Sequence, residues 1–362
     1  MGISGDSLID LLRHRYDDVI DVRSPSEFAE DHLPGAINLP VLNDPERAEV
    51  GTIYKQDSRF NARKLGAALV LRNVARHVET ALVDRPADWR PLVYCWRGGQ
   101  RSGTFACLMR EIGWRAETLE GGYRTYRRHV AAMFHADPMP WRFVVLQGMT
   151  CTGKTDLLKE LAKLGAQTLD LEAAAAHRGS VFGATAAAQP SQKMFESRLA
   201  EVLVHYDTRR PVVLEAESSK VGDVLIPPQL WQAMCAAPRV EVSAPLPVRA
   251  EYFQRAYADL VADPARFAAK LQTLAPIQGH ARVAAWLELL SSGDHAALSA
   301  SLMETHYDPR YSRALARHGS QPIGALHLES LSSEGITQAA PQVLSLIDRI
   351  DGAGPVQVAS AS

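Results

Sequence analysis

The sequence predicts an α/β protein with two domains, and three observations support this fold class. The chain has 362 residues and 46% hydrophobic content, which is enough for two hydrophobic cores rather than one. Short apolar runs alternate with longer helical patterns, as in parallel sheets covered by helices. Two prolines, Pro138 and Pro140, separate a helical stretch from a new strand. We therefore expect one domain at 1–134, a linker at 135–141 and a second domain at 142–350.

The first domain is predicted to be a small α/β unit with a parallel sheet. Apolar runs at 19–22 and 92–94 indicate buried strands. Helical patterns are expected near 63–80 and from Ser102 onward. The alternation of these runs with helices favours parallel pairing of the strands.

The second domain is predicted to begin with a strand at 143–147 and a helix at 156–164. A second buried strand at 212–214 ends in acidic residues, and the chain from about Val248 onward is mainly helical. The tail at 351–362 is small and polar, which predicts disorder. One apolar stripe at helical spacing is expected to be core, and it consists of Met194, Phe195, Leu199, Val202 and Leu203.

Composition excludes several classes of protein. The formal charge of −2 argues against a uniformly basic nucleic-acid coat. The four cysteines show neither metal-ligand spacing nor the density of a disulfide scaffold, which favours a reducing cytoplasm. The first residues lack the features of a signal peptide, and no apolar run is long enough to span a membrane. We expect a cytoplasmic protein with no membrane partner.

The first candidate site is the loop Cys95-Trp96-Arg97-Gly98-Gly99-Gln100-Arg101-Ser102, which follows an apolar strand and opens a helix. Backbone amides and the helix N-terminus would converge on the Cys95 sulfur, and Arg97 and Arg101 would favour its thiolate and hold an anion. Gly98, Gly99 and Ser102 would form the rest of the oxyanion cradle. The alternative is that Cys95 is an inert buried cysteine at a strand end. Cys107 lies five residues past Ser102 on the following helix, and we expect it to pack in the core.

The second candidate site is the phosphate loop Gly148-Met149-Thr150-Cys151-Thr152-Gly153-Lys154-Thr155, which has the full P-loop spacing between a strand and a helix. Amides between Gly148 and Lys154 would wrap a diphosphate, Lys154 would neutralise its charge, and Thr155 could ligate Mg²⁺. The ligand could be a nucleotide, an allylic diphosphate or RNA phosphate. We expect a P-loop NTPase-like domain without a tightly bound cofactor.

Acidic and basic residues add weaker candidates. Glu215 and Glu217 follow the strand at 212–214, as metal-side acids would, although they could equally be solvated at a strand end. His177 and Arg178 could contact phosphate or RNA. A segment that interleaves tyrosines with positive charge is a candidate RNA surface or else a solvated helix face, and its basic residues are Arg124, Arg127 and Arg128.

The first domain resembles the rhodanese family over nearly all of 1–134. The resemblance rests on the segments Asp21-Val22-Arg23-Ser24-Pro25-Ser26-Glu27-Phe28 and His32-Leu33-Pro34-Gly35-Ala36-Ile37-Asn38-Leu39-Pro40, and on Gly121-Gly122-Tyr123. It implies a rhodanese-like fold in which Cys95 is the persulfide-forming cysteine. The five residues between Cys95 and Arg101 equal the spacing of cysteine phosphatases, so a chalcogen-substituted phosphate would fit.

The whole chain resembles the tRNA 2-selenouridine synthase family, because a rhodanese-like domain precedes a P-loop domain. Further matching segments are Val50-Gly51-Thr52-Ile53-Tyr54-Lys55-Gln56, His177-Arg178-Gly179-Ser180-Val181-Phe182-Gly183, Glu215-Ala216-Glu217-Ser218 and His306-Tyr307-Asp308-Pro309-Arg310-Tyr311.

The resemblance implies a transferase that converts wobble 2-thiouridine in tRNA to 2-selenouridine. The route passes through S-geranyl-2-thiouridine and uses geranyl diphosphate and selenophosphate, with Cys95 as the selenium-accepting nucleophile. The expected partners are tRNA, these two small molecules and the enzyme that produces selenophosphate.

Two other classes of function fit the residues less well. One is a rhodanese-type sulfurtransferase coupled to a P-loop ATPase in tRNA thiolation, with a persulfide on Cys95. The other is a regulatory module in which a phosphatase-like rhodanese fold recognises phosphorylated partners. ATP dependence and thiosulfate turnover would favour the first. The reactive loop around Cys95 argues against the second.

Overall fold

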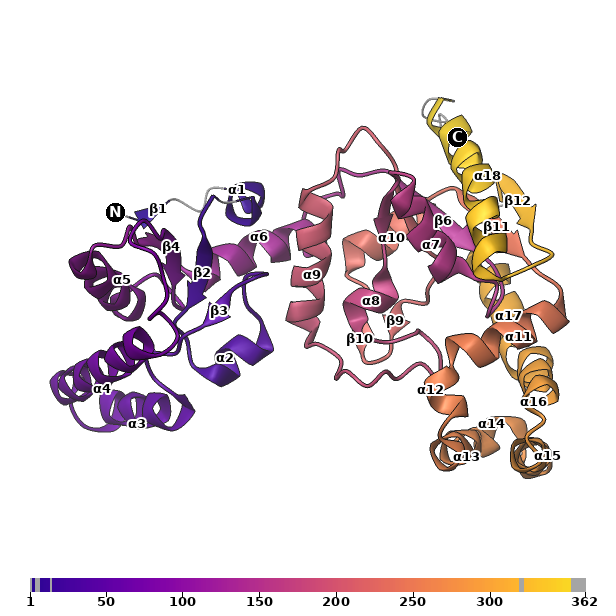
Figure 1. Cartoon of the computed structure of the whole chain (residues 1–362), viewed down its shortest axis with the longest axis horizontal. Coiled ribbons are helices and arrows are strands. Elements are labelled where there is room, and N and C mark those ends of the chain that lie inside the picture. The colour runs from indigo at the N-terminus through magenta and orange to yellow at the C-terminus, as the bar shows by residue number, and fades with distance from the viewer. Residues whose placement is uncertain (1, 4–6, 14, 319–321, 353–362) are drawn as a thin grey trace, which may run out of the picture. The chain divides into compact units, whose positions relative to one another are not determined.

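The computed structural model describes residues 2, 3, 7–13, 15–318 and 322–352, and these residues form two compact units (Figure 1). The first unit contains Met1–Pro138 and Pro190–His205, and the second contains Met139–Gln189 and Tyr206–Ser362. The first boundary falls inside the linker expected at 135–141. Of the tail expected at 351–362, residues 351 and 352 belong to the last helix, and 353–362 lie outside the described residues.

The first unit is built on a five-stranded sheet in the order β1-β5-β4-β2-β3, and each recorded pairing is parallel. The strands are β1 Gly2–Ile3, β2 Asp18–Asp21, β3 Ile37–Asn38, β4 Pro91–Tyr94 and β5 Glu117–Leu119. Its helices are α1 Leu8–Leu12, α2 Pro25–Glu30, α3 Asp44–Gln56, α4 Arg59–Glu79, α5 Gln100–Ile112, α6 Tyr123–His135 and α9 Gln192–Val204. The strands predicted at 19–22 and 92–94 are therefore confirmed as β2 and β4.

Helix α9 belongs to the first unit although its sequence lies inside the segment that we assigned to the second domain. Ser191 caps the helix by accepting a hydrogen bond from the Met194 amide. The apolar stripe is buried as predicted except at Val202, which is half-buried, and Leu199 is fully enclosed. Buried Glu196 also pairs with Arg127 and His135 of α6. These contacts explain why residues 190–205 pack with the first unit, although the segments before and after them belong to the second.

The second unit has a five-stranded sheet in the order β12-β11-β6-β8-β7, again with parallel pairing. The main strands are β6 Phe143–Gln147, β7 Gln167–Leu169, β8 Val212–Glu215, β11 Arg239–Ser243 and β12 Gly324–His327. A separate small ribbon pairs β9 Lys220–Val221 with β10 Val224–Leu225. The phosphate loop follows β6, the central strand, where helix N-termini and strand carboxyl ends meet.

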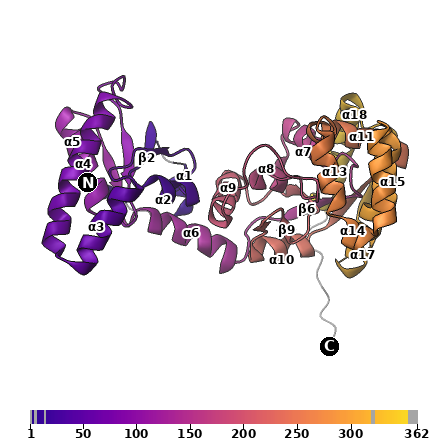
Figure 2. The same cartoon turned by 90° about the horizontal axis from the view of Figure 1, so that it is seen from below.

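The C-terminal part is largely helical, as predicted, apart from β12. Figure 2 shows α11, α13 and α15 gathered together in this part of the unit. An aromatic core that includes Phe182, Phe253, Phe267 and Trp286 holds them. The helices of the second unit are α7 Lys154–Lys163, α8 Leu171–Ala175, α10 Pro228–Ala236, α11 Leu246–Ala256, α12 Ala258–Val261, α13 Pro264–Gln272, α14 Ala275–Gln278, α15 His280–Ser291, α16 His295–Leu302, the π-helix η1 Met303–Tyr307, α17 Asp308–His318 and α18 Ser333–Gly352.

The two parallel sheets with their covering helices confirm the predicted α/β class. Within the described ranges, no helix combines the length and the apolarity that crossing a membrane requires.

Candidate functional site

The cysteine loop joins β4 to α5, and the local sequence explains its tight path. Gly98 has φ +65°, and a Cβ there would lie 2.5 Å from the Leu119 carbonyl oxygen. Gly122 has φ +58°, and its Cβ would lie 2.2 Å from the Cys95 carbonyl oxygen. Only glycine fits these two close backbone approaches. The Tyr123 amide then donates to the Cys95 carbonyl at 2.9 Å, which fixes the loop against the start of α6.

The Cys95 thiol is only 3% exposed, yet its surroundings favour the thiolate. Burial acts to raise the pKa of this thiol, but hydrogen bonds from the Ser102 hydroxyl and from the Ser102 and Arg97 amides outweigh it. The Arg101 charge also favours the thiolate, and the net result is a lowered pKa. The Ser102 hydroxyl lies 3.2 Å from the sulfur. A thiolate held in this way is a nucleophile.

An arginine pair lies beside this loop and lines a cavity of about 500 Å³ together with Trp96. Arg101 Nη1 lies 3.1 Å and Arg47 Nε 3.0 Å from the same oxygen of Glu27. Burial opposes ionisation of Glu27, but Arg101 and Arg47 hold its pKa below the usual range. Glu27 thus fixes both guanidinium groups. Arg47 was not a sequence candidate, because α3 is remote in the chain from Cys95.

The signature around Asp21 has a structural role. Arg23 is fully buried and pairs with Asp21 at 2.6 Å. Its guanidinium carbon lies 4.0 Å from the centre of the Tyr123 ring. The Tyr123 hydroxyl donates to Asp31 at 2.7 Å. This network anchors the segment that closes the cysteine loop.

The phosphate loop wraps between β6 and α7, and its P-loop spacing produces the expected turn. Lys154 Nζ donates to the Gly148 carbonyl at 2.8 Å and to the Met149 carbonyl at 3.2 Å. The Gly148 amide donates to the Tyr311 hydroxyl at 2.7 Å. Cys151 has φ +64°, and burial raises the pKa of its thiol to about 12. Cys151 is therefore not activated as a nucleophile.

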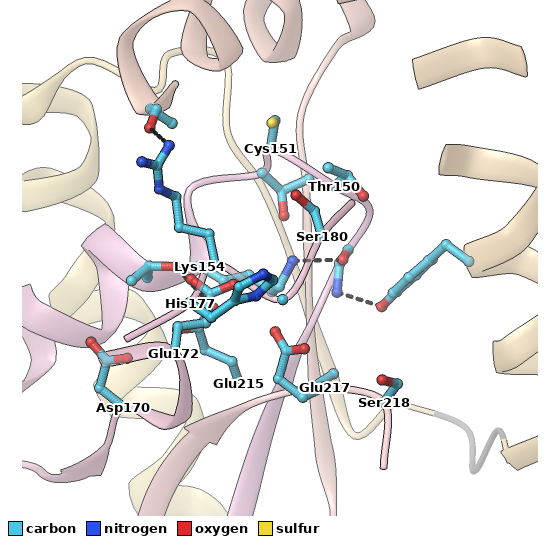
Figure 3. Close-up of a pocket in the computed structure, with 18 of the residues that line it drawn as sticks. Thr150, Cys151, Lys154, Asp170, Glu172, His177, Ser180, Glu215, Glu217 and Ser218 are labelled. Carbon is cyan, nitrogen blue, oxygen red and sulfur yellow. Dashed lines mark hydrogen bonds between the residues drawn. The ribbon is translucent and has the colours of Figure 1, made fainter. Parts of the chain in front are cut away.

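Three glutamates gather below this loop (Figure 3). Glu172, Glu215 and Glu217 each offer a carboxylate oxygen, and these oxygens lie within 4.8 Å of one another. Burial and the neighbouring carboxylates raise the pKa of all three. Thr155 Oγ1 donates to Glu215 at 2.9 Å. The sequence indicated Glu215 and Glu217 but missed Glu172, which comes from the short helix α8.

The residues present fit a divalent cation. Glu215 is 2% exposed, and its Oε1 has no hydrogen-bond partner among the described residues. A buried carboxylate oxygen without a donor is costly unless a cation or a proton balances it. Oxygen ligands of this kind suit Mg²⁺. A Cβ added at Gly179, which has φ +64°, would lie 2.7 Å from a Glu217 oxygen, so the segment after His177 lies directly against the cluster.

A cavity of about 1040 Å³ opens in front of the phosphate loop and includes this cluster. His177 and Arg178, expected at phosphate or RNA, both line it. Burial lowers the pKa of His177. Arg178 is engaged by Asp259 at 2.7 Å and by the Ala256 carbonyl at 2.9 Å.

The tyrosines of the candidate RNA segment are not available for stacking, which corrects that part of the prediction. Tyr123 and Tyr126 are 3% and 0% exposed. Arg127 is taken up by Glu196, while Arg124 and Arg128 are exposed. The helical period of α6 decides this difference, because it turns both rings and Arg127 inward. The expectation for Cys107 is also wrong, since its side chain is exposed on α5.

Comparison with known proteins identifies relatives of both units. The model of the rhodanese-like domain matches residues 4–129, and the model of the tRNA 2-selenouridine synthase AAA domain matches residues 141–332.

Three similar proteins are tRNA 2-selenouridine synthases. The one from Aeromonas salmonicida is 38% identical over 68% of this chain and 67% of its own length. The one from Nitrosomonas europaea is 36% identical over 64% and 61%. The one from Shewanella denitrificans is 33% identical over 87% of this chain and 84% of its own length. The matched segments thus range from about three fifths to over four fifths of these relatives.

Proposed function

The chain belongs to the tRNA 2-selenouridine synthase family, and we propose on that premise that it exchanges the sulfur of wobble 2-thiouridine in tRNA for selenium in two stages. It is then a tRNA-modifying transferase that uses geranyl diphosphate and selenophosphate. The observation that carries the proposal is the presence of two complete anion sites of different chemistry, an activated thiol and a phosphate loop.

The phosphate loop is the proposed site of the first stage. The thiocarbonyl sulfur of the base forms a bond to C1 of the geranyl group, the C1–O bond breaks, and diphosphate leaves with the bonding electrons. N3 of the base releases its proton to solvent. Backbone amides of the loop and Lys154 stabilise the charge on the departing diphosphate. Val181, Ala256 and Tyr257 line the same cavity and offer surface for the hydrocarbon chain.

Thr155, Glu215 and Glu217 would hold Mg²⁺ at this site, together with Glu172. A bound Mg²⁺ supplies positive charge that favours departure of the diphosphate. The chain's own contribution is to place these oxygens on rigid elements, because Glu215 ends β8 and Thr155 lies in the first turn of α7.

The cysteine loop is the proposed site of the second stage. Selenium replaces the geranylthiol group at C2 of the base, and water completes the phosphate that remains. Geranylation prepares this exchange, because a thiocarbonyl sulfur cannot leave, whereas an S-alkyl group departs as a thiol. Selenophosphate would lie against the Cys95 thiolate, with its phosphate held by loop amides, Arg97 and Arg101.

The electron count limits what Cys95 can do. Selenium in selenophosphate is already at the oxidation level of selenide, so the exchange at C2 needs no oxidant. Selenium carried on Cys95 as an S–Se bond would need a two-electron oxidant. Attack of the Cys95 thiolate on phosphorus needs none: the S–P bond forms, the P–Se bond breaks, and the released selenide displaces geranylthiol at C2. Water then cleaves the S–P bond and releases phosphate. Mass spectrometry of the Cys95 peptide after selenophosphate treatment separates these cases, because only a selenium adduct shows the selenium isotope pattern.

Nucleoside mass spectrometry tests the proposal as a whole. Purified protein is incubated with 2-thiouridine tRNA, geranyl diphosphate and selenophosphate, and the wobble nucleosides are compared with those from Cys95→Ala and Lys154→Ala. We expect selenouridine from the wild type, S-geranyl-2-thiouridine from Cys95→Ala, and unmodified 2-thiouridine from Lys154→Ala. Product that requires ATP and thiosulfate would instead support the sulfurtransferase alternative.

A further inference from the structure

We propose that one arm of the large cavity binds the 2-thiouracil base of the tRNA. The arm is defined by Trp231, Met234 and Cys235 of α10, Arg239 of β11 and Tyr311 of α17, all of which line the cavity. The inference rests on the proposed transfer to tRNA and adds where the accepting base lies. None of these residues belongs to the phosphate loop or to the glutamate cluster.

Geometry requires the base to enter this cavity. Two reactants must approach within about 3–3.5 Å for a bond to form, so the base must reach the diphosphate ester where the phosphate loop holds it. A base in a tRNA loop can leave its stack to do so. The volume of about 1040 Å³ is at the upper end of the range for a single small ligand, which leaves room for a second reactant.

Arg239 supplies the main observation. It is 8% exposed, and its Nη2 donates to the Met234 carbonyl only at 3.4 Å. Its Nε is buried and has no hydrogen-bond partner among the residues that the structure describes. A buried guanidinium with so few partners is expected to meet a polar group of a ligand. The carbonyl oxygen O4 of a uracil ring is such an acceptor.

Trp231 supplies a flat surface. Its half-buried ring lines the same arm from α10, and Met234, one helical turn further on, adds apolar surface beside it. Aromatic rings stack with nucleobases of any sequence, and this is the usual way in which proteins hold an unstacked base.

Tyr311 connects the arm to the phosphate loop. Its hydroxyl accepts the hydrogen bond from the Gly148 amide at 2.7 Å, so the arm begins next to the first residue of the loop. A base held there would present its sulfur toward the diphosphate ester. The geranyl chain is a worse occupant of this arm, because a hydrocarbon would leave Arg239 without a partner.

Binding of anticodon stem-loops to the full-length protein tests the inference without any transfer reaction. The probes are fluorescent stem-loops with either 2-thiouridine or an abasic site at the wobble position, and fluorescence anisotropy gives both affinities. We expect the wild type to prefer the 2-thiouridine loop by about tenfold, since stacking on one ring is of that order. Trp231→Ala should abolish the preference and leave binding of the abasic loop unchanged. Arg239→Met should reduce the preference several-fold.

Two control variants show whether a lost preference comes from the missing ring or from misfolding. Trp231→Phe keeps a ring and should retain most of the preference, and Gln232→Ala, at an exposed position on the same helix, should retain all of it. The inference is overturned if the wild type shows no preference or if Trp231→Ala keeps it. Weakened geranyl diphosphate binding by Trp231→Ala, with the base preference intact, would assign the arm to the prenyl chain. Failure of the proposed function gives a different result from failure of this inference. If only the proposed function is wrong, the wild type prefers the 2-thiouridine loop but does not geranylate it.

Discussion

The two anion loops each contain a cysteine, and the two thiols have opposite properties. Both loops follow a central parallel strand and lead into a helix. The pKa of Cys95 is lowered although the residue is buried, whereas burial raises the pKa of Cys151 to about 12. The difference lies in the donors, because Cys95 receives hydrogen bonds from Ser102 and from loop amides. A glycine-rich loop before a helix therefore does not by itself activate a cysteine.

The loops also differ in the charge that they face. The cysteine loop has arginines beside it, held by Glu27. The phosphate loop faces three carboxylates, with Lys154 as the nearby cation. The first site can bind an anion with protein charges alone, whereas the second gains from a divalent cation. Four predictions probe this comparison.

Replacing each loop cysteine by serine in turn should give the largest difference in activity between two variants. Cys95→Ser should lower selenium transfer by more than about 10³-fold, because a hydroxyl is not ionised near neutral pH. Cys151→Ser should change the rate by no more than about twofold, because this half-buried thiol has a raised pKa and is not an activated nucleophile. Single-turnover assays on S-geranyl tRNA measure both. Equal losses in the two variants would contradict the assignment of the nucleophile.

Lys154→Ala should weaken geranyl diphosphate binding by about 10- to 100-fold, as expected for loss of a charge-assisted hydrogen bond. Isothermal titration calorimetry measures this affinity. Lys163→Ala, on the same helix but paired with Glu160 at the surface, is the matched control and should bind normally. If Arg101→Ala produced the same loss, the two loops would not have separate ligands.

Glu215→Gln tests the cation site through thermal unfolding. Mg²⁺ should raise the melting temperature of the wild type by about 3 °C and that of the variant by much less. Without Mg²⁺ the variant should be the more stable protein at pH 8. The reason is that the raised pKa of this carboxyl makes the folded wild type lose stability as the pH rises above the value of an unfolded glutamate.

Two results would contradict this site. One is that Mg²⁺ raises the melting temperature of Glu215→Gln as much as that of the wild type. The other is that, without Mg²⁺, the variant exceeds the wild type in stability by more at pH 5 than at pH 8. Asp223→Asn, at a position 91% exposed, controls for the loss of one negative charge.

Ser102→Ala should have the smallest effect. Removing the hydroxyl that donates to Cys95 should shift the alkylation midpoint of this thiol to higher pH, so that iodoacetamide labelling at pH 7 slows by about three- to tenfold. Peptide mass spectrometry across a pH series measures the midpoint. An unchanged midpoint would mean that the loop amides and Arg101 alone lower the pKa.

Local sequence was sufficient for much of the architecture. The strands β2, β4, β6 and β8 and the opening of α7 follow from short apolar runs and from the P-loop spacing, which depend on neighbouring residues only. Sequence pattern also indicated both loops. The strands β11 and β12 were not predicted. Arg239 and Glu241 interrupt the apolar run of β11, and β12 begins with a glycine, so neither segment reads as a continuous apolar strand.

Local sequence patterns could not predict interactions between segments that are distant in the chain. Helix α9 lies in the middle of the second domain's sequence, yet Glu196 and Ser197 bring it into the first unit. Glu196 also forms an ion pair with Arg127, which the charge pattern of the sequence had indicated as an RNA contact. Tyr126 was likewise turned inward by the packing of α6.

By itself, the sequence determined the two-domain α/β class, the reactive cysteine loop, the phosphate loop and the family resemblance, because each depends on residues that are close together in the chain. Only the tertiary structure decided that Ser102 activates Cys95, that Glu172 joins Glu215 and Glu217, and that Arg239 lies short of partners in the cavity wall. The physical reason is that pKa values, cation sites and unsatisfied donors depend on the burial and distance of side chains brought together by folding.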